Sequence, residues 1–376
     1  MEGTLMFFIY LFLLIYLFFM IWLFDGYNYL VKKINYNNKD LPFVSIVVAI
    51  KNEEHNLSTL INNLINQDYP EKLYEIIICN DRSDDNSLDI IQSFKHQHQN
   101  FHIINIKSLP NNWVGKKWAL FNGIKKSKGE IILQTDADCK MNKKWISAMI
   151  SQFSDKSVGF VSSLTPLFAN NNFFDKILSI DSIAQDAFVA CSFGKKMTLS
   201  CVARSIAFRK KYFFQSGGYN QISHIESGDD DLLLHKIMHY VGCDVKYIIN
   251  QDAVVYSIPP NNLLQFIHQR LRFASKGFLY YKNKFISNEL KIILPVLYLV
   301  NLFTVICIVN FCKTASLIYL VPIFLKLIPD FLFIYTFGYD LKIKFDVFPV
   351  LFLVLMHPFY IVFFGILGPI YSYKWK

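Results

Sequence analysis

The sequence of 376 residues predicts an α/β domain that is built on a largely parallel sheet and flanked by transmembrane helices. Short, continuous apolar runs alternate with polar segments of helical character, which is typical of a parallel sheet covered on both faces. Much longer apolar runs lie at both ends of the chain, and each could cross a hydrocarbon layer of ~30 Å. These observations, and the 53% hydrophobic content, exclude a disordered or fibrous protein.

The expected membrane segments are four apolar runs, at 5–24, 292–311, 315–337 and 346–370. The first run follows Glu2 rather than basic residues and has no small-residue cleavage site, so we interpret it as an uncleaved anchor. The runs predict an anchor at 1–25, a soluble domain at 42–261, an amphipathic interfacial helix at 262–287 and about three transmembrane helices at 290–371.

The charges next to the anchor predict the orientation of the chain. Lys32, Lys33 and Lys39 follow it closely, and basic residues favour the cytoplasmic side. The seven cysteines are scattered without a CxxC pair, so neither a disulfide framework nor a zinc site is indicated. We therefore expect an integral protein of the plasma (inner) membrane with a cytoplasmic domain. The net charge of +9 fits nucleic acid, an anionic membrane surface and an anionic substrate equally well, so composition alone does not choose among them. We expect membrane lipids and an anionic substrate, and no nucleic acid, as partners.

Two charged residues interrupt the third apolar run. Lys326 and Asp330 are spaced i, i+4 around Pro329, and ionisable groups at membrane depth usually pair or face a protein-lined cavity. We expect an internal ion pair, with a role in acceptor passage as the alternative. In the fourth run, the His357-Pro358 pair predicts a kink.

Polar side chains follow the first two apolar strands of the predicted sheet, at 43–50 and 75–79. Asn52 and Glu53 come after the first strand, and Asp81 comes after the second. Parallel strands end at one edge of the sheet, where open α/β sheets bind their ligands. The residues together predict a nucleotide site, although each one alone could be a helix cap.

The third strand, at 130–135, ends in two carboxylates. Asp136 and Asp138 are separated by one residue, so in an extended segment both side chains project from the same face. Two adjacent carboxylates repel each other unless a cation lies between them, and oxygen ligands favour Mg²⁺ or Mn²⁺. The alternative is a solvated acidic turn.

A second acidic cluster, GDDD at 228–231, precedes an apolar helical segment. Acidic residues at a helix start are favoured by the helix dipole, which explains at least one of them. A bond exchange at a sugar carbon also needs a base that is separate from the metal site. Asp230 is the candidate base.

The segment 262–285 is basic and amphipathic, which is typical of a helix that lies on a membrane surface. It contains Gln269, Arg272 and Phe273 in the sequence QRLRF. Arginine offers a planar group for phosphate oxygens, and an aromatic face can stack on a sugar ring. The alternatives are an ordinary surface helix and a set of basic residues that face lipid.

Taken in order, these motifs resemble those of glycosyltransferase family 2, in the membrane-bound branch with cellulose, chitin and hyaluronan synthases and ceramide glucosyltransferases. The resemblance covers about residues 42–285 and includes KNEE at 51–54 and GKKWALFNGI at 115–124. It implies a GT-A fold, a UDP-sugar donor, a divalent metal and an inverting displacement at the anomeric carbon.

The resemblance also implies roles for individual residues. Asn52 and Glu53 lie in the nucleotide segment, and Asp81 matches the position that binds the base and ribose. Asp136 and Asp138 would hold the donor diphosphate through Mg²⁺ or Mn²⁺. The position on the 115–124 segment that approaches the donor is Lys117, or alternatively Lys116.

The resemblance also implies roles for the second acidic cluster and for the QRLRF segment. Asp230 matches the general base of a Glu-Asp pair in which Asp229 replaces the glutamate. Gln269, Arg272 and Phe273 match the QxxRW motif that closes the donor site, with phenylalanine in place of tryptophan.

This replacement of tryptophan and the short C-terminal membrane part favour transfer to a lipid or short glycan acceptor over synthesis of a long polymer. A processive polysaccharide synthase is the nearest alternative, and a catalytically silent membrane scaffold of the same fold is a further one. A transporter is disfavoured, because the apolar runs are few and show no two-fold repeat.

Overall fold

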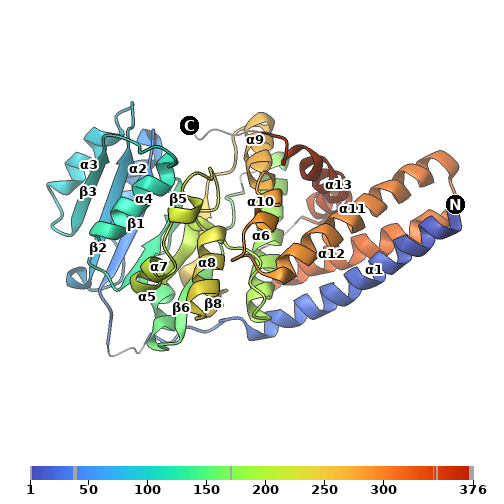
Figure 1. The fold of residues 1–376 in the computed structure, drawn as a ribbon, viewed down its shortest axis with the longest axis horizontal. Helices are drawn as coiled ribbons and strands as arrows, with labels where there is room; N and C mark the ends of the chain where they lie inside the picture. Colours follow the sequence, from blue (N-terminus) through green and yellow to red (C-terminus); the bar gives the residue numbers. More distant parts are fainter. Residues whose placement is uncertain (1, 37–39, 170–171, 342, 344–345, 372–376) are drawn as a thin grey trace. The chain divides into compact units, whose positions relative to one another are not determined.

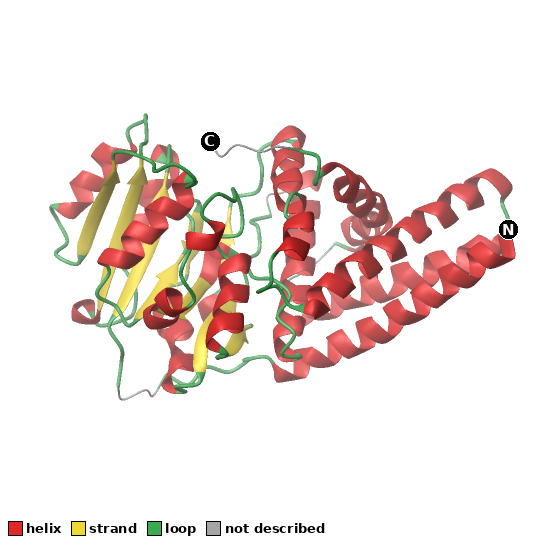
Figure 2. Ribbon diagram, in the orientation of Figure 1, coloured by secondary structure: helices red, strands yellow, loops and turns green. Residues whose placement is uncertain are grey.

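The computed structural model describes residues 2–36, 40–169, 172–341, 343 and 346–371, and the chain forms two compact units. The sheet unit comprises the described residues within 30–168 and 198–258. The helical unit comprises those within 1–29, 169–197 and 259–373. Figure 1 gives the elements along the chain, and Figure 2 shows that strands occur in one unit while the other is helical.

The sheet unit contains a seven-stranded sheet in the order β3-β2-β1-β4-β7-β6-β8. Neighbouring strands run parallel except at β7, which is antiparallel to both β4 and β6. A second, small sheet pairs β5 with β9 in antiparallel fashion. The strands are β1 (Val44–Ile50), β2 (Tyr74–Asp81), β3 (Phe101–Ile106), β4 (Ile131–Gln134), β5 (Cys139–Met141), β6 (Val158–Ser163), β7 (Ile206–Arg209), β8 (Asp244–Ile248) and β9 (Val255–Ser257).

The helices of the sheet unit connect these strands. They are α2 (Glu54–Ile65), α3 (Ser87–Lys95), α4 (Gly115–Lys126), α5 (Trp145–Ile150), α7 (Lys210–Gln215) and α8 (Asp231–Val241). The continuous apolar strand sequences are explained by burial on both faces, since every residue of β1 and β2 is buried. The predicted parallel α/β sheet is confirmed.

The two faces of β1 pack against different helices, as the alternation of side chains along a strand requires. Ile46 and Val48 belong to the main core, together with Leu57 on α2. On the other face, a Cβ at Gly123 of α4 would lie 2.5 Å from a methyl carbon of Val47. Glycine at position 123 therefore allows α4 to approach the sheet closely.

The helical unit consists of α1 (Glu2–Asp25), α6 (Phe173–Gly194), α9 (Leu263–Ala274), α10 (Gly277–Lys282), α11 (Asn288–Thr314), α12 (Leu320–Asp340) and α13 (Val347–Leu367). Within the described part of the chain, five helices are long and apolar enough to cross a membrane: α1, α6, α11, α12 and α13. Four of them correspond to the four apolar runs expected from the sequence. The predicted interfacial helix is divided into α9 and α10.

Helix α6 is a candidate span that is not among the four apolar runs. The domain expected at 42–261 contains it, but α6 belongs to the helical unit. The sheet unit is therefore interrupted between β6 and β7. Its sequence contains Asp175, Lys176, Asp181 and Asp186, which lower its hydropathy and obscure the span. Lys39, one of the lysines used to predict orientation, lies outside the described residues.

Several ionic groups among the described residues of the helical unit are paired. Lys326 donates to Asp330 within α12, so the predicted ion pair is confirmed, and the Tyr16 hydroxyl of α1 donates to the same carboxylate. Arg270 of α9 contacts Asp181 of α6 at 2.5 Å. These pairs satisfy charges that would otherwise be costly among apolar helices.

Candidate active site

The loops after β1 and β2 are tied together at the carboxyl edge of the sheet. Asn52, which has a φ of +55°, accepts a hydrogen bond from the Asp84 N–H (2.8 Å), and its own N–H donates to the Ser83 hydroxyl (3.0 Å). The Glu53 N–H donates to the Ser87 hydroxyl at 2.9 Å. The structure therefore brings Asn52 and Glu53 beside the loop that follows Asp81, as parallel topology requires.

Asp81 is buried at the end of β2. Arg82 contacts it with two nitrogens, Nε to Oδ1 at 2.8 Å and Nη2 to Oδ2 at 3.2 Å. A Cβ at Gly115, the first residue of α4, would lie 1.9 Å from Asp81 Oδ2. Only glycine at position 115 leaves room for this carboxylate beside the start of α4.

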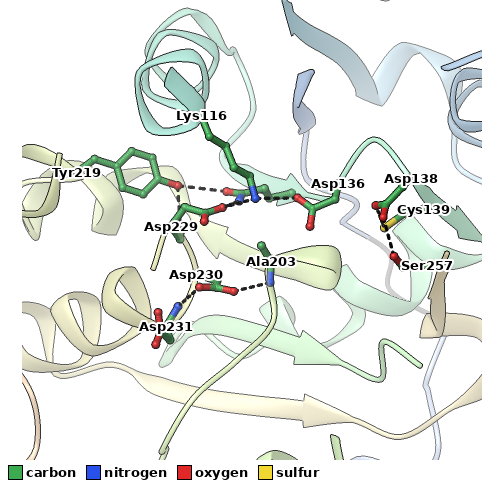
Figure 3. Close-up of polar contacts among 11 residues, drawn as sticks. Lys116, Asp136, Asp138, Cys139, Ala203, Tyr219, Asp229, Asp230, Asp231 and Ser257 are labelled. Atoms are coloured by element: carbon green, nitrogen blue, oxygen red, sulfur yellow. Dashed lines mark hydrogen bonds and ion pairs between the residues drawn. The ribbon is translucent and has the colours of Figure 1, made fainter. Parts of the chain in front are cut away.

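A lysine joins the two acidic clusters of the sequence (Figure 3). The Lys116 ammonium lies 2.9 Å from an Asp136 oxygen and 2.8 Å from an Asp229 oxygen. The three side chains come from the first turn of α4, the segment after β4 and the segment before α8. Burial alone would lower the pKa of Lys116, but the carboxylates of Asp136 and Asp229 raise it above its ordinary value.

Asp229 is held by further contacts. Gln134 Nε2 donates to Asp229 Oδ2 at 3.3 Å, and the Tyr219 hydroxyl lies 3.2 Å from the Asp229 carbonyl oxygen and 3.3 Å from Gln134 Oε1. Burial would raise the pKa of Asp229, but the neighbouring Lys116 ammonium lowers it below its ordinary value. Lys116 and Gln134 both contact Asp229 Oδ2, and the ion pair favours the charged form of this carboxylate.

Asp138 lies on the turn between β4 and β5. Ser257 on the paired strand β9 donates to Asp138 Oδ2 at 2.9 Å. Burial, and then the charge of Asp136, raise the pKa of Asp138 above its ordinary value. The charge of Asp136 thus disfavours the charged form of Asp138.

The donor set at this turn fits a hard divalent cation. Asp136 and Asp138 supply only oxygen ligands, and their mutual repulsion would be relieved by a bound cation. Among the described residues, no group of three or more His, Cys, Asp or Glu side chains has a metal-binding arrangement. Mg²⁺ and Mn²⁺ at phosphate sites commonly have one or two protein carboxylates and complete their shell with phosphate and water oxygens, which is consistent with this pair.

Asp230 begins α8 and is oriented by two backbone donors. Its Oδ1 accepts from the Asp231 N–H at 2.7 Å, and its Oδ2 accepts from the Ala203 N–H at 2.9 Å. The side chain is half-buried. One of these contacts is the helix cap expected for an acidic residue at this position, and the other fixes the carboxylate against the segment before β7.

Lys117 does not join the carboxylates. The residue is 1% exposed. Its ammonium donates to the backbone carbonyls of Ile222 (2.8 Å), Ile225 (2.7 Å) and Ser227 (2.8 Å). The sequence predicts Lys117, or alternatively Lys116, for the approach to the donor. The structure favours Lys116, because three carbonyls accept from the Lys117 ammonium, whereas Lys116 contacts Asp136 and Asp229.

Gln269, Arg272 and Phe273 lie on α9 in the helical unit, at spacings that put them on one helix face. Asn262 caps this helix by accepting from the Gln265 N–H at 2.9 Å. The Arg272 guanidinium lies 5.2 Å from the centre of the Phe273 ring, whose residue is 41% exposed. Their approach to the donor remains a prediction.

Two residues that contact Asp229, Gln134 and Tyr219, are not among the site residues predicted from the sequence. Gln134 is a polar side chain at the end of a buried strand, which is a recognisable signal. Tyr219 follows Gly217 and Gly218, and nothing local indicates that its hydroxyl reaches Gln134. The burial of Lys117 could have been recognised from its helical phase with Leu120 and Ile124.

Comparisons with known proteins identify relatives of this chain. The family model described as glycosyl transferase family 2 matches residues 45–217. A beta-monoglucosyldiacylglycerol synthase of Trichormus variabilis is 27% identical over 247 residues, which are 63% of this chain and 49% of that protein. A poly-beta-1,6-N-acetyl-D-glucosamine synthase of Staphylococcus epidermidis is 26% identical over 235 residues, 62% of this chain and 54% of that protein. The chain thus spans about half the length of these curated relatives.

One solved structure is similar over nearly the whole chain. It is the mannosyltransferase PcManGT from Pyrobaculum calidifontis, in complex with GDP-Man and Mn²⁺. The TM-score is 0.56 at 14% identity, and the match covers 97% of this chain and 94% of that one. At this identity the likeness shows a shared fold.

Proposed function

We propose that this chain, whose family 2 domain has a GT-A fold, is a glycosyltransferase that moves a sugar from a UDP-sugar to a lipid or glycan acceptor. In this proposal the acceptor is at the cytoplasmic face of the plasma (inner) membrane, and the anomeric carbon is inverted. The curated relatives carry names of a glycolipid synthase and of a polysaccharide synthase, which supports an acceptor of one of these classes.

The observation that carries the proposal is the ionic cluster of Lys116, Asp136 and Asp229. It lies at the carboxyl edge of the sheet, where β1 and β2 end and where Asn52 and Asp81 also lie. In the proposal, these loops bind the nucleotide, and Lys116 is positioned to contact the donor phosphates.

Asp136 and Asp138 are the residues that would hold Mg²⁺ or Mn²⁺. A cation bound there would neutralise charge that develops on the donor diphosphate as the sugar departs. The similar solved structure is a complex with GDP-Man and Mn²⁺, which supports the use of a divalent cation.

Asp230 is the proposed general base. Asp229 is engaged by Lys116 and Gln134, so it is a poor acceptor for a further proton. Asp230 accepts from two backbone N–H groups, and because a carboxylate has several lone pairs it can also accept from a sugar or lipid hydroxyl. As that hydroxyl oxygen attacks the anomeric carbon, its proton passes to Asp230, and the bond to the diphosphate breaks on the opposite face.

Gln269, Arg272 and Phe273 are proposed to close the donor site. An arginine next to the diphosphate would stabilise charge on the leaving group, and Phe273 would offer an aromatic face to a sugar ring. This role is inferred from the sequence motif alone, because the three residues belong to the helical unit and the carboxylates belong to the sheet unit.

We favour a glycolipid or short lipid-linked glycan as the product over a long polymer. The basis is the phenylalanine at position 273, where the motif has tryptophan. The second candidate, a processive polysaccharide synthase, is supported by the similarity to the Staphylococcus protein at nearly the same identity as the glycolipid synthase.

The test is a transfer assay in native-like membranes with radiolabelled UDP-sugars and GDP-sugars, each with Mg²⁺ or Mn²⁺. Lipid-extractable label is separated from high-molecular-weight label, and Asp136→Asn and Asp138→Asn serve as matched inactive variants. We expect label from one UDP-sugar in the lipid fraction.

Other results would change the proposal in defined ways. Label in high-molecular-weight material would establish the processive alternative, and transfer from a GDP-sugar would refute the UDP assignment. No transfer from any donor by the wild type would favour the silent scaffold over the proposed reaction.

A further inference from the structure

The acidic pair Asp229 and Asp230 is carried by a loop with little regular structure. The loop starts after α7 at Ser216 and runs to the start of α8. It contains three glycines with positive φ, at +78° for Gly217, +51° for Gly218 and +83° for Gly228. Such a segment has many alternative conformations, so its native conformation depends on contacts from outside.

Those contacts come largely from the first turn of α4. The Lys117 ammonium donates to the carbonyls of Ile222, Ile225 and Ser227 at 2.7–2.8 Å. The Val114 N–H, just before α4, donates to the Ser223 carbonyl at 2.8 Å. The last of the three carbonyls bound by Lys117 is two residues from Asp229.

Burying an ammonium is costly unless its hydrogen bonds are satisfied. The three carbonyls meet the full donor capacity of Lys117, which is 1% exposed and therefore makes no contact with a ligand from solvent. An apolar side chain would fill the space with a smaller desolvation penalty, but it would donate no hydrogen bond to the three carbonyls. The Lys117 ammonium therefore holds these three positions of the loop together.

We propose that Lys117 is a positioning residue for the proposed base Asp230 and for Asp229. Its neighbour Lys116 pairs with Asp229 directly, so a single helical turn sets both the course of the loop and the charge beside its acidic pair. The inference rests on the proposed function, because it assigns Lys117 a part in transfer through Asp230.

The loop has a second buried contact at its other end. Lys236 of α8 donates to the Gly218 carbonyl, and the Tyr219 hydroxyl contacts Gln134 at 3.3 Å. This end is fixed independently of Lys117. Loss of the Lys117 contacts should therefore displace the Ile222–Gly228 part of the loop and the carboxylates after it while the sheet remains intact.

The test variant is Lys117→Met, which keeps the length of the side chain and removes its N–H donors. Lys125→Met is the matched control, because Lys125 lies on the same helix and is exposed. The protein is full-length, in membranes, with the nucleotide sugar and metal that the wild type uses.

The measurement is turnover per donor site. Sites are counted by equilibrium binding of the radiolabelled nucleoside diphosphate that the wild type releases, and kcat is expressed per site. We expect Lys117→Met to keep at least half of the sites and a donor KM within about threefold, with kcat per site lower by about 10–100-fold, since small misplacements of reacting groups have effects of this size. Lys125→Met should match the wild type.

A second variant perturbs the loop without touching Lys117. In Gly228→Ala, a Cβ would lie 2.5 Å from Leu232 and the residue would keep a φ that disfavours alanine. We expect the same pattern, with donor sites retained and kcat per site reduced.

The outcomes separate the inference from the proposed function. Unchanged kcat per site in Lys117→Met would overturn the positioning role. Loss of donor sites in proportion to activity, in either variant, would also overturn it, since the residue would then support the fold as a whole. A wild type that binds the nucleotide but transfers nothing would instead refute the proposed function.

Discussion

The sheet unit and the helical unit handle charge in different ways. At the edge of the sheet, the Lys116 and Asp136 side chains are 16% and 29% exposed and share their charges with a third group, Asp229. In the helical unit, Lys326 is 1% exposed and its partner Asp330 is 13% exposed. Asp136 is accessible to a ligand, whereas Lys326 is enclosed by helices.

This difference indicates different uses for similar residues. A partly open cluster can exchange its ion pairs for contacts with a charged substrate, so its replacement should affect turnover more than stability. A buried pair has no such exchange, and removing one partner leaves an uncompensated charge in an apolar setting. Five experiments test this contrast, starting with the largest expected effect.

Replacing the proposed base should abolish transfer while leaving the fold intact. In Asp230→Asn the amide oxygen can accept from only one of the two backbone N–H groups that Asp230 binds, and the side chain cannot take a proton. We expect kcat to fall by about 10²–10⁴-fold, with a loss of only about 1–3 kcal/mol in stability from the backbone N–H left without its acceptor. Asp89→Asn, an exposed change on α3, is the control. Retention of most activity would show that another group takes the proton.

Breaking the buried pair should have the opposite pattern. Asp330→Asn leaves the Lys326 ammonium without its counter-charge, and we expect a loss of about 3–5 kcal/mol in the free energy of unfolding. The thermal midpoint in lipid nanodiscs measures this, together with turnover per folded molecule. The double change Lys326→Met with Asp330→Leu should be less destabilising. Equal damage from both would mean that charge compensation is not what the pair provides.

Removing divalent metal should affect the sheet unit through its open carboxylates. With free Mn²⁺ at 100 times its Kd, metal binding stabilises the folded state by about 2.7 kcal/mol. Adding a chelator should therefore lower the thermal midpoint of the wild type. The midpoint of Asp138→Asn should respond much less, and an equal response would place the metal elsewhere.

The lysine of the open cluster is expected to matter for transfer to a smaller degree. Lys116→Met removes two charge-assisted contacts, worth roughly 1.5–3 kcal/mol, which corresponds to a fall of about 10–150-fold in kcat/KM. Initial rates over a range of donor concentration give this value. A large loss of thermal stability with unchanged kcat/KM would make Lys116 comparable to the buried pair instead.

The smallest effect is expected at position 273. Phe273→Trp keeps an aromatic face and adds an indole N–H, so turnover should change by no more than about threefold. The length of the product is the informative readout. A shift from lipid-extractable to high-molecular-weight product would show that this position sets chain extension.

Much of the sheet could be predicted from the sequence, because its signals are local. The predicted strands at 43–50, 75–79 and 130–135 match β1, β2 and β4 within a few residues. Their runs of β-branched residues define strands without reference to the rest of the chain.

Features that depend on distant partners could not be predicted. Helix α6 carries Asp181, whose charge is met by Arg270 of α9, 89 positions later in the chain. Local composition therefore makes α6 resemble a polar helix of the sheet unit. The adjacent Lys116 and Lys117 likewise differ only in what the fold brings to them, carboxylates for one and backbone carbonyls for the other.

The interruption of the sheet by α6 has a consequence for biogenesis. Strand β7 joins β4 to β6 in the sheet, yet it is synthesised only after α6. A nascent chain that ends before β7 has the strands β3-β2-β1-β4 with β4 at an unpaired edge, and a β6 whose neighbours β7 and β8 are not yet made, which exposes it to aggregation. The order of translation thus requires a candidate membrane span to leave the ribosome before the sheet can be completed.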